Sequence, residues 1–98
     1  MARYQIMYWK DIPSQVKADD GEGTAKAMLS DRFQQAIDAA AMADGSTGTD
    51  AYLEGWAWGK RNEREGSAQA VVDEVVAELE SEYTPERLRE LIRERKQA

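Results

Sequence analysis

Residues 3–9 read Arg-Tyr-Gln-Ile-Met-Tyr-Trp, a run rich in the aromatic and branched side chains that favour strands. Lys10, Asp11, Ile12 and Pro13 follow as a turn. Because Pro13 has no N–H to donate to a ladder, we expect the second strand to begin after it, over residues 14–18. The connection is short, so the two strands are expected to pair antiparallel.

After a polar loop at residues 19–23, apolar residues recur at the spacing of a helix. Thr24 is a candidate N-cap for a helix that runs to about Asp44, with Gly45 as its C′ residue. The apolar residues of this segment share one helical stripe: Leu29, Phe33, Ala36, Ile37 and Ala40. After a loop at residues 45–50, alternation returns over residues 51–58 and predicts a third strand.

The last third of the chain predicts two more helices. Residues 59–66 are expected to form a charged turn, and Ser67 to cap a helix with a broad apolar face of alanine, valine and leucine. Thr84 and Pro85 then give a second helix start, with Thr84 as N-cap and Pro85 at the first helical position.

The element order β-β-α-β-α-α predicts the α+β class. We expect a three-stranded antiparallel sheet in the order 2-1-3, with the helices packed on one face. The 98 residues are expected to form a single domain over 1–98, with a core in 1–83 and a peripheral C-terminal helix in 84–98.

Composition excludes several classes of site. The chain has no cysteine and no histidine, so disulfides, thiol nucleophiles, cysteine zinc sites and the usual general base near neutral pH are not available. We predict no catalytic residue, no metal site and no cofactor. The net charge of −6 makes nucleic acid an unfavourable partner. No apolar run is long enough for a membrane span and no secretory signal is visible, so we expect a cytoplasmic location and no membrane partner.

Two loops resemble ligand motifs only in part. The Gly21-Glu22-Gly23 stretch precedes a predicted helix, but the third glycine of a dinucleotide fingerprint would fall at Lys26. The segment that starts at Asp44 lacks the glycine at position six and the glutamate at position twelve of a calcium loop. We interpret both as turns.

Strand parity divides the predicted sheet residues into two faces. The expected core face holds Tyr4, Ile6, Tyr8, Val16, Ala18, Leu53, Gly55 and Ala57. The other face mixes polar residues with all three tryptophans, and its candidate binding residues are Met7, Trp9, Lys17, Tyr52, Trp56 and Trp58. An exposed aromatic cluster with a polar rim is typical of a partner site. The alternative is that the last helix covers the tryptophans with Leu88, Leu91 and Ile92.

Three segments together resemble a known family. They are residues 7–16 (Met-Tyr-Trp-Lys-Asp-Ile-Pro-Ser-Gln-Val), residues 32–38 and residues 47–56. They are similar to the small bacterial "virulence factor" domain, which also occurs at the C-terminus of conserved virulence factor C proteins. The resemblance spans roughly residues 3–80 and implies no catalytic residue. It suggests an accessory subunit associated with folate- or corrinoid-dependent methyl transfer.

Three functional hypotheses follow. The first is a non-catalytic interaction module or accessory subunit of a bacterial cytoplasmic complex, which docks another protein, or a second copy of itself, through the aromatic face. The second is a small-molecule or cofactor-binding domain in which Lys17 or Lys60 contacts the charge of the ligand. The third is an enzyme, which would have to rely on carboxylate or tyrosine chemistry alone.

Overall fold

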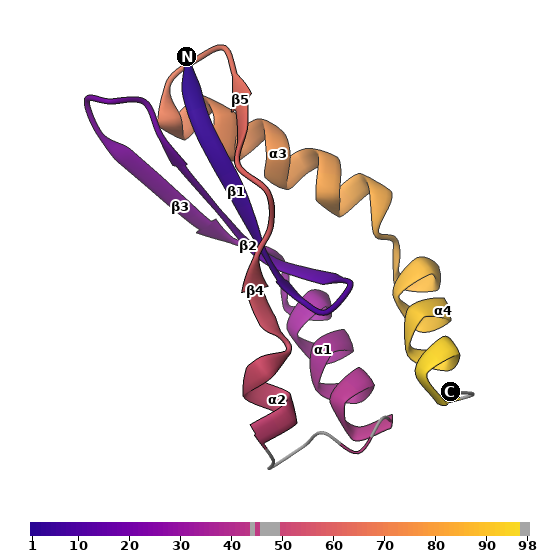
Figure 1. Ribbon diagram of the computed structural model, residues 1–98. Coiled ribbons are helices and arrows are strands. Elements are labelled where there is room, and N and C mark those ends of the chain that lie inside the picture. Colours follow the sequence, from indigo (N-terminus) through magenta and orange to yellow (C-terminus); the bar gives the residue numbers. More distant parts are fainter. Residues whose placement is uncertain (44, 46–49, 97–98) are drawn as a thin grey trace.

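A computed structural model describes residues 1–43, 45 and 50–96 (Figure 1). Its elements, in chain order, are β1 (Ala2–Trp9), β2 (Ile12–Asp19), β3 (Thr24–Met28), α1 (Asp31–Ala43), α2 (Asp50–Glu54), β4 (Trp56–Trp58), β5 (Asn62–Arg64), α3 (Ala68–Glu82) and α4 (Pro85–Lys96).

Within the described ranges, five strands form one antiparallel sheet in which β1 is central. The order is β3-β2-β1-β4, and β5 also pairs with β1. Along one edge of β1, Ala2–Tyr4 pair with β5 and Met7–Trp9 pair with β4. The α+β class and the antiparallel sheet are confirmed, whereas the prediction of three strands in the order 2-1-3 is wrong because the sheet has five.

The first correction concerns residues 24–28, which are the edge strand β3 instead of the start of a helix. Their exposure alternates, with Ala25 and Ala27 packed against the core. A tight turn precedes β3, because the Asp19 and Asp20 carboxylates accept hydrogen bonds from backbone N–H groups of residues 21–23. The first helix begins only at Asp31, and its predicted end at Asp44 lies outside the described residues.

The second correction concerns residues 51–66. The predicted strand over 51–58 is a short helix, α2, followed by a three-residue strand, β4. The predicted charged turn contains the strand β5. As a result, Leu53 and Ala57, which we expected in the core, are exposed, and Leu53 is 68% exposed.

A bulge changes the register between β1 and β2. Met7 pairs with Gln15 but Tyr8 pairs with Pro13, so Ser14 is an extra residue. The Ser14 carbonyl accepts from the Leu29 N–H at 3.0 Å. The prediction that the strand starts after Pro13 is therefore wrong: a bulge accommodates a proline that a regular ladder would exclude.

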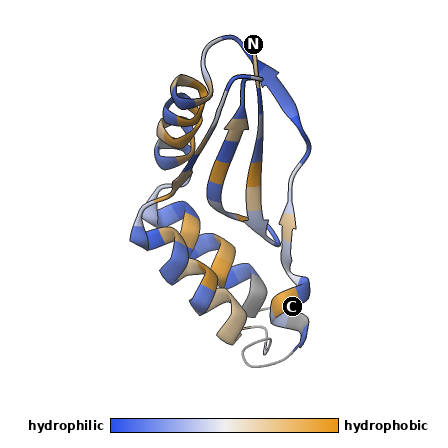
Figure 2. Ribbon diagram, turned by 90° about the vertical axis from the view of Figure 1, so that its left-hand side faces the viewer, coloured by the Kyte–Doolittle hydropathy of each residue, from blue (hydrophilic) through white to orange (hydrophobic). Residues whose placement is uncertain are grey.

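The helix α3 lies along one face of the sheet, as Figures 1 and 2 show. Its N-terminus is capped as predicted, since the Ser67 hydroxyl accepts from the Ala70 N–H at 3.2 Å. Its buried residues are Ala68, Val71, Val72, Val75 and Leu79. The helices α1 and α4 pack against each other beyond the sheet, where Leu88 and Leu91 of α4 belong to the same core cluster.

Candidate functional site

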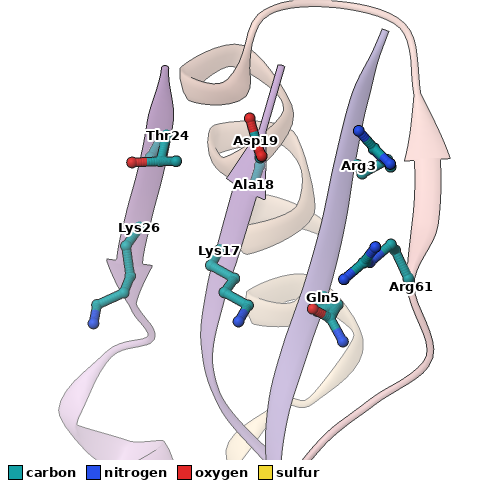
Figure 3. Close-up of a pocket in the computed structure, with 9 residues that line it drawn as sticks. Arg3, Gln5, Lys17, Ala18, Asp19, Thr24, Lys26 and Arg61 are labelled. Carbon is teal, nitrogen blue, oxygen red and sulfur yellow. The ribbon is translucent and has the colours of Figure 1, made fainter. Parts of the chain in front are cut away.

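The sheet face opposite α3 carries side chains that the helices leave accessible; we call it the open face. Parity separates it from the core face, since Val16 and Ala18 are buried under α3 while Lys17 between them is half-buried. Figure 3 shows this face with α3 behind it. Its members, all half-buried or exposed, are Arg3, Gln5, Met7, Gln15, Lys17, Asp19, Thr24, Lys26, Met28, Trp58 and Glu63.

The strand register arranges these residues in three rows across the sheet. The row we call apolar has Met28, Met7 and Trp58, with the polar Gln15 between the two methionines. The basic row is Lys26, Lys17 and Gln5. The outer row is Thr24, Asp19, Arg3 and Glu63. In the outer row Arg3 lies between two carboxylates, whereas the two lysines of the basic row are direct cross-strand partners.

A hollow of about 440 Å³ lies over the basic and outer rows. Its lining includes Lys17, Lys26 and Arg61, the last from the segment that joins β4 to β5 (Figure 3). Within the described residues, none of these three cations lies within 4.0 Å of a carboxylate. The hollow therefore presents cationic groups whose charge this part of the chain does not compensate by contact.

Lys17 links the basic row to the apolar row. Its Nζ lies 3.9 Å from the centroid of the Trp58 ring, in cation–π geometry. The contact holds the lysine over one face of an indole that is 36% exposed. Met28, at the other end of the apolar row, is 62% exposed.

Trp9, which we expected on the exposed aromatic face, is completely buried, so that expectation is wrong. Its indole N–H donates to the Tyr52 carbonyl at 2.8 Å, and its ring lies against the backbone of Gly55. Tyr52 of α2 and the residue after that helix, Gly55, contact the ring. The last helix packs against α1 and Trp58 is 36% exposed, so the alternative in which the last helix covers the tryptophans is wrong as well.

The other predicted aromatics take part in the same packing. Tyr52 lies on α2 instead of a strand, 5.9 Å from the Trp9 ring and 6.1 Å from the Trp56 ring between centroids. Tyr52 and Trp56 are both half-buried. Of the six predicted site residues, Met7, Lys17 and Trp58 are accessible members of the open face, whereas Trp9 and Trp56 lie on the same side of the sheet at the end that α2 covers.

Sequence reasoning did not assign six members of the open face to it: Arg3, Asp19, Thr24, Lys26, Met28 and Glu63. It also did not place Arg61 at the hollow. Lys26 and Met28 were assigned to a helix, although the alternation of small and long side chains over residues 24–28 also fits a strand. Once β3 is recognised as a strand, parity places Lys26 beside Lys17.

Two tyrosines on the helix side of the molecule have perturbed acidity. Burial raises the pKa of Tyr8, with a further contribution from Glu82, and burial likewise raises the pKa of Tyr83. A raised pKa keeps both phenols protonated near neutral pH, which opposes their use as bases.

In the described ranges, no three acidic side chains are grouped to hold a metal ion. None of the helices in those ranges has the length and apolar character to cross a membrane.

Comparison with known proteins gives one finding. A family model described as "Virulence factor" matches residues 7–92, which includes most of the open face. Neither the curated proteins nor the solved structures contain a match to this chain.

Proposed function

This chain belongs to the virulence factor family, and from the geometry of its open face we propose that it is a non-catalytic binding module. In this proposal it acts as an accessory subunit of a bacterial cytoplasmic complex and docks another protein through the open face. The observation that supports it best is the apolar row, which crosses four strands; in the described chain α2 covers the neighbouring Trp9 but leaves Met28 and Trp58 exposed.

The apolar row suits docking because its ends are exposed and its members are adaptable. Methionine packs against irregular partner surfaces, and tryptophan is enriched at the centre of interfaces. Met28 and Trp58 stand at opposite ends of the row, with the flexible Met7 between them. The cation–π contact with Lys17 already restricts the Trp58 ring, which lowers the entropy that binding would cost.

The charge of the face defines the chemistry of the partner. Four cations (Arg3, Lys17, Lys26 and Arg61) and two carboxylates (Asp19 and Glu63) lie on or beside it, although the whole chain has a net charge of −6. A stable interface buries about 800 Å² per partner. The four side chains of the apolar row cannot supply that area, so the proposed partner also contacts the basic row. The partner is therefore a protein surface with apolar side chains flanked by carboxylates.

A pair of methionine substitutions tests the docking surface. The tagged chain is purified from its source organism, and a co-purifying protein is then produced separately and its affinity measured by calorimetry. Met28→Glu places a charge in the apolar row and is expected to weaken binding by about 100-fold, or about 2.7 kcal/mol. Met42→Glu is the matched control, because Met42 is 72% exposed on α1, outside the open face.

Both variants are expected to keep the thermal stability of the unmodified chain, since both side chains are exposed. Equal affinity of the two variants for the purified partner would refute the docking surface. Association of the chain with itself, measured by light scattering and abolished by Met28→Glu, would identify the partner as a second copy and overturn the proposal of an acidic one.

A second candidate function is the binding of a small molecule on the same face. The observation in its favour is the hollow over the basic row, because about 440 Å³ lies within the usual range of ligand pockets. In this proposal Lys17 contacts the charge of the ligand. Lys60 does not line the hollow.

A further inference from the structure

The strand β3 forms a regular edge of the sheet, and within the described residues no other strand pairs with its outer side. It stands at one end of the order β3-β2-β1-β4, and its register with β2 is continuous over the whole strand. The opposite edge differs, because β4 and β5 are only three residues long each and pair with separate parts of β1. Short, interrupted edges resist the addition of another strand, whereas a regular edge is a template for one.

Two hydrogen bonds at the ends of the β2–β3 ladder show which backbone groups of β3 point outward. The Leu29 N–H donates to the Ser14 carbonyl at 3.0 Å, and the Asp20 N–H donates to the Gly23 carbonyl at 3.1 Å. Hydrogen-bonded pairs alternate along an antiparallel ladder, so between these two bonds the alanines of β3 bond to β2. The residues whose N–H and C=O groups point away from β2 are Thr24, Lys26 and Met28.

The helix side of this edge has apolar surface left for a further strand. Ala25 and Ala27 are half-buried, and so is Val76 of α3, which packs against the same core. Val76 lies one turn before Glu80, whose carboxylate accepts hydrogen bonds from Ser30 just beyond β3. This stripe of α3 therefore faces the β3 end of the sheet. Apolar side chains of an added strand can pack against it.

The other side of the edge presents one cation, Lys26. Its side chain is exposed and, in the part of the chain that the structure describes, lies within 4.0 Å of no carboxylate. Figure 3 shows it directed away from Lys17 and toward the outer side of β3. Lys17 is directed the other way, with its Nζ 3.9 Å from the Trp58 ring centroid. An added strand would therefore lie beside Lys26 alone.

Charge decides which strand fits. A second copy paired antiparallel over the whole of β3 would place the two Lys26 side chains opposite each other, and like charges in that position destabilise a sheet. The net charge of −6 on each copy also opposes self-association. A carboxylate opposite Lys26 would instead form a favourable cross-strand pair.

We propose that the outer edge of β3 binds an extended segment of a partner protein as an added strand, with a carboxylate opposite Lys26 and apolar side chains on either side of it. The outward backbone groups of β3 provide the hydrogen bonds, and Lys26 selects the charge of the segment. This edge is a second interaction surface. Docking through the open face does not depend on it, because that surface consists of side chains across four strands.

The test measures hydrogen exchange and amide shifts of the isolated chain by NMR at low ionic strength. The probe is the peptide Thr-Val-Glu-Val-Thr with both termini blocked, which reads the same in both directions and so fits either strand orientation. The control peptide has lysine in place of glutamate. The net charge of −6 attracts the lysine peptide, so a preference for glutamate cannot come from the overall field.

We expect the glutamate peptide to slow exchange of the outward amide of Lys26 and to shift it more than the inward amides of Ala25 and Ala27. The lysine peptide is expected to bind at least about fivefold more weakly, a difference of about 1 kcal/mol. Silence from both peptides, or equal binding of the two, would overturn the proposal. Slow exchange of the Lys26 amide that appears with rising protein concentration and no peptide would identify a second copy and overturn the acidic partner.

A charge-reversal variant tests the role of Lys26. Lys26→Glu is expected to invert the preference, so that the lysine peptide binds more tightly than the glutamate peptide. Lys60→Glu is the matched control, because Lys60 is exposed on the segment between β4 and β5 and the variant changes the same charge at the other edge. An uninverted preference in Lys26→Glu, or equal effects of the two variants, would overturn the pairing with Lys26.

A second pair of variants separates the backbone from the charge. Lys26→Gln removes the charge and is expected to weaken the glutamate peptide by up to about fivefold. Lys26→Pro also removes the outward N–H, which β2 does not use, and is expected to abolish binding of both peptides. Equal binding by the two variants would overturn strand addition. If Lys26→Pro fails to fold, the charge reversal and the exchange of the Lys26 amide decide the outcome.

Discussion

Gly55→Ala is expected to destabilise the fold by about 2–6 kcal/mol through a clash with the Trp9 ring. A Cβ atom on Gly55 would lie 2.5 Å from Trp9 Nε1 and 2.8 Å from Cε2, well inside van der Waals contact. Overpacking of a core costs about 1–3 kcal/mol. Displacement of the ring would also break the hydrogen bond to the Tyr52 carbonyl, which leaves a buried donor unpaired at a cost of about 1–3 kcal/mol.

The measurement is urea unfolding followed by far-UV circular dichroism, with Gly23→Ala as the matched control. A Cβ on Gly23 meets no atom within 4 Å, so this variant is expected to be unchanged or more stable by about 0.4–1 kcal/mol. For a domain of this size, the loss in Gly55→Ala corresponds to a fall in Tm of about 8–48 °C. The double variant with Trp9→Phe is expected to lose less than the sum of the two single losses. If Gly55→Ala and Gly23→Ala unfold at the same urea concentration, the packing of α2 against Trp9 is refuted.

The two kinds of tryptophan are expected to differ in unfolding experiments: Trp9→Ala should cost about 3–5 kcal/mol, whereas Trp58→Ala should cost less than about 1 kcal/mol. Similar losses would contradict the assignment of Trp9 to the core. Ser67→Ala should lower the free energy of unfolding by about 1 kcal/mol through loss of the α3 cap, and an unchanged urea midpoint would argue against that cap. Asp20→Ala should also destabilise, because the Asp20 carboxylate accepts from the Ala68 N–H and from the β2–β3 turn, and these bonds lower its pKa. A lowered folded-state pKa gives stability above the ordinary pKa of about 3.9, lost as pH falls. The difference between wild type and variant should therefore shrink below about pH 4, and a constant difference down to pH 2 would refute this role.

The elements that sequence predicted well are those whose signals are local. Ser67 is a capping residue followed by a valine-rich apolar stripe, and α3 begins at Ala68, directly after the cap. Thr84 and Pro85 likewise mark the start of α4, where the Thr84 hydroxyl accepts from the Arg87 N–H. The pairing of β1 with β2 also follows from neighbouring residues.

The errors arose where packing between distant segments overrides local pattern. Residues 51–55 alternate like a strand, but α2 folds against Trp9, more than 40 positions earlier in the chain. Gly55 permits that contact because it has no Cβ atom to clash with the Trp9 ring. The sequence alone does not show that the two residues lie together. Parity placed Trp9 on the same side as Met7 and Trp58, which the pairing confirms. It did not reveal that a helix covers one end of that face.

The candidate site was predicted in part for the same reason. Met7, Lys17 and Trp58 belong to strands that were recognised, and parity assigned them correctly to the open face. Lys26 belongs to a strand that was read as a helix. Arg61 joins the hollow only because both β4 and β5 pair with β1.

The double pairing of β1 has a kinetic consequence during synthesis on the ribosome. Its first partner, β2, follows it within a few residues, but its other edge pairs only with residues 56–64. At about 5–20 residues per second, the nascent chain carries an unpaired strand edge for about 3–10 s. An edge of this kind recruits other strands, so aggregation during translation should be governed by how soon residues 56–64 emerge.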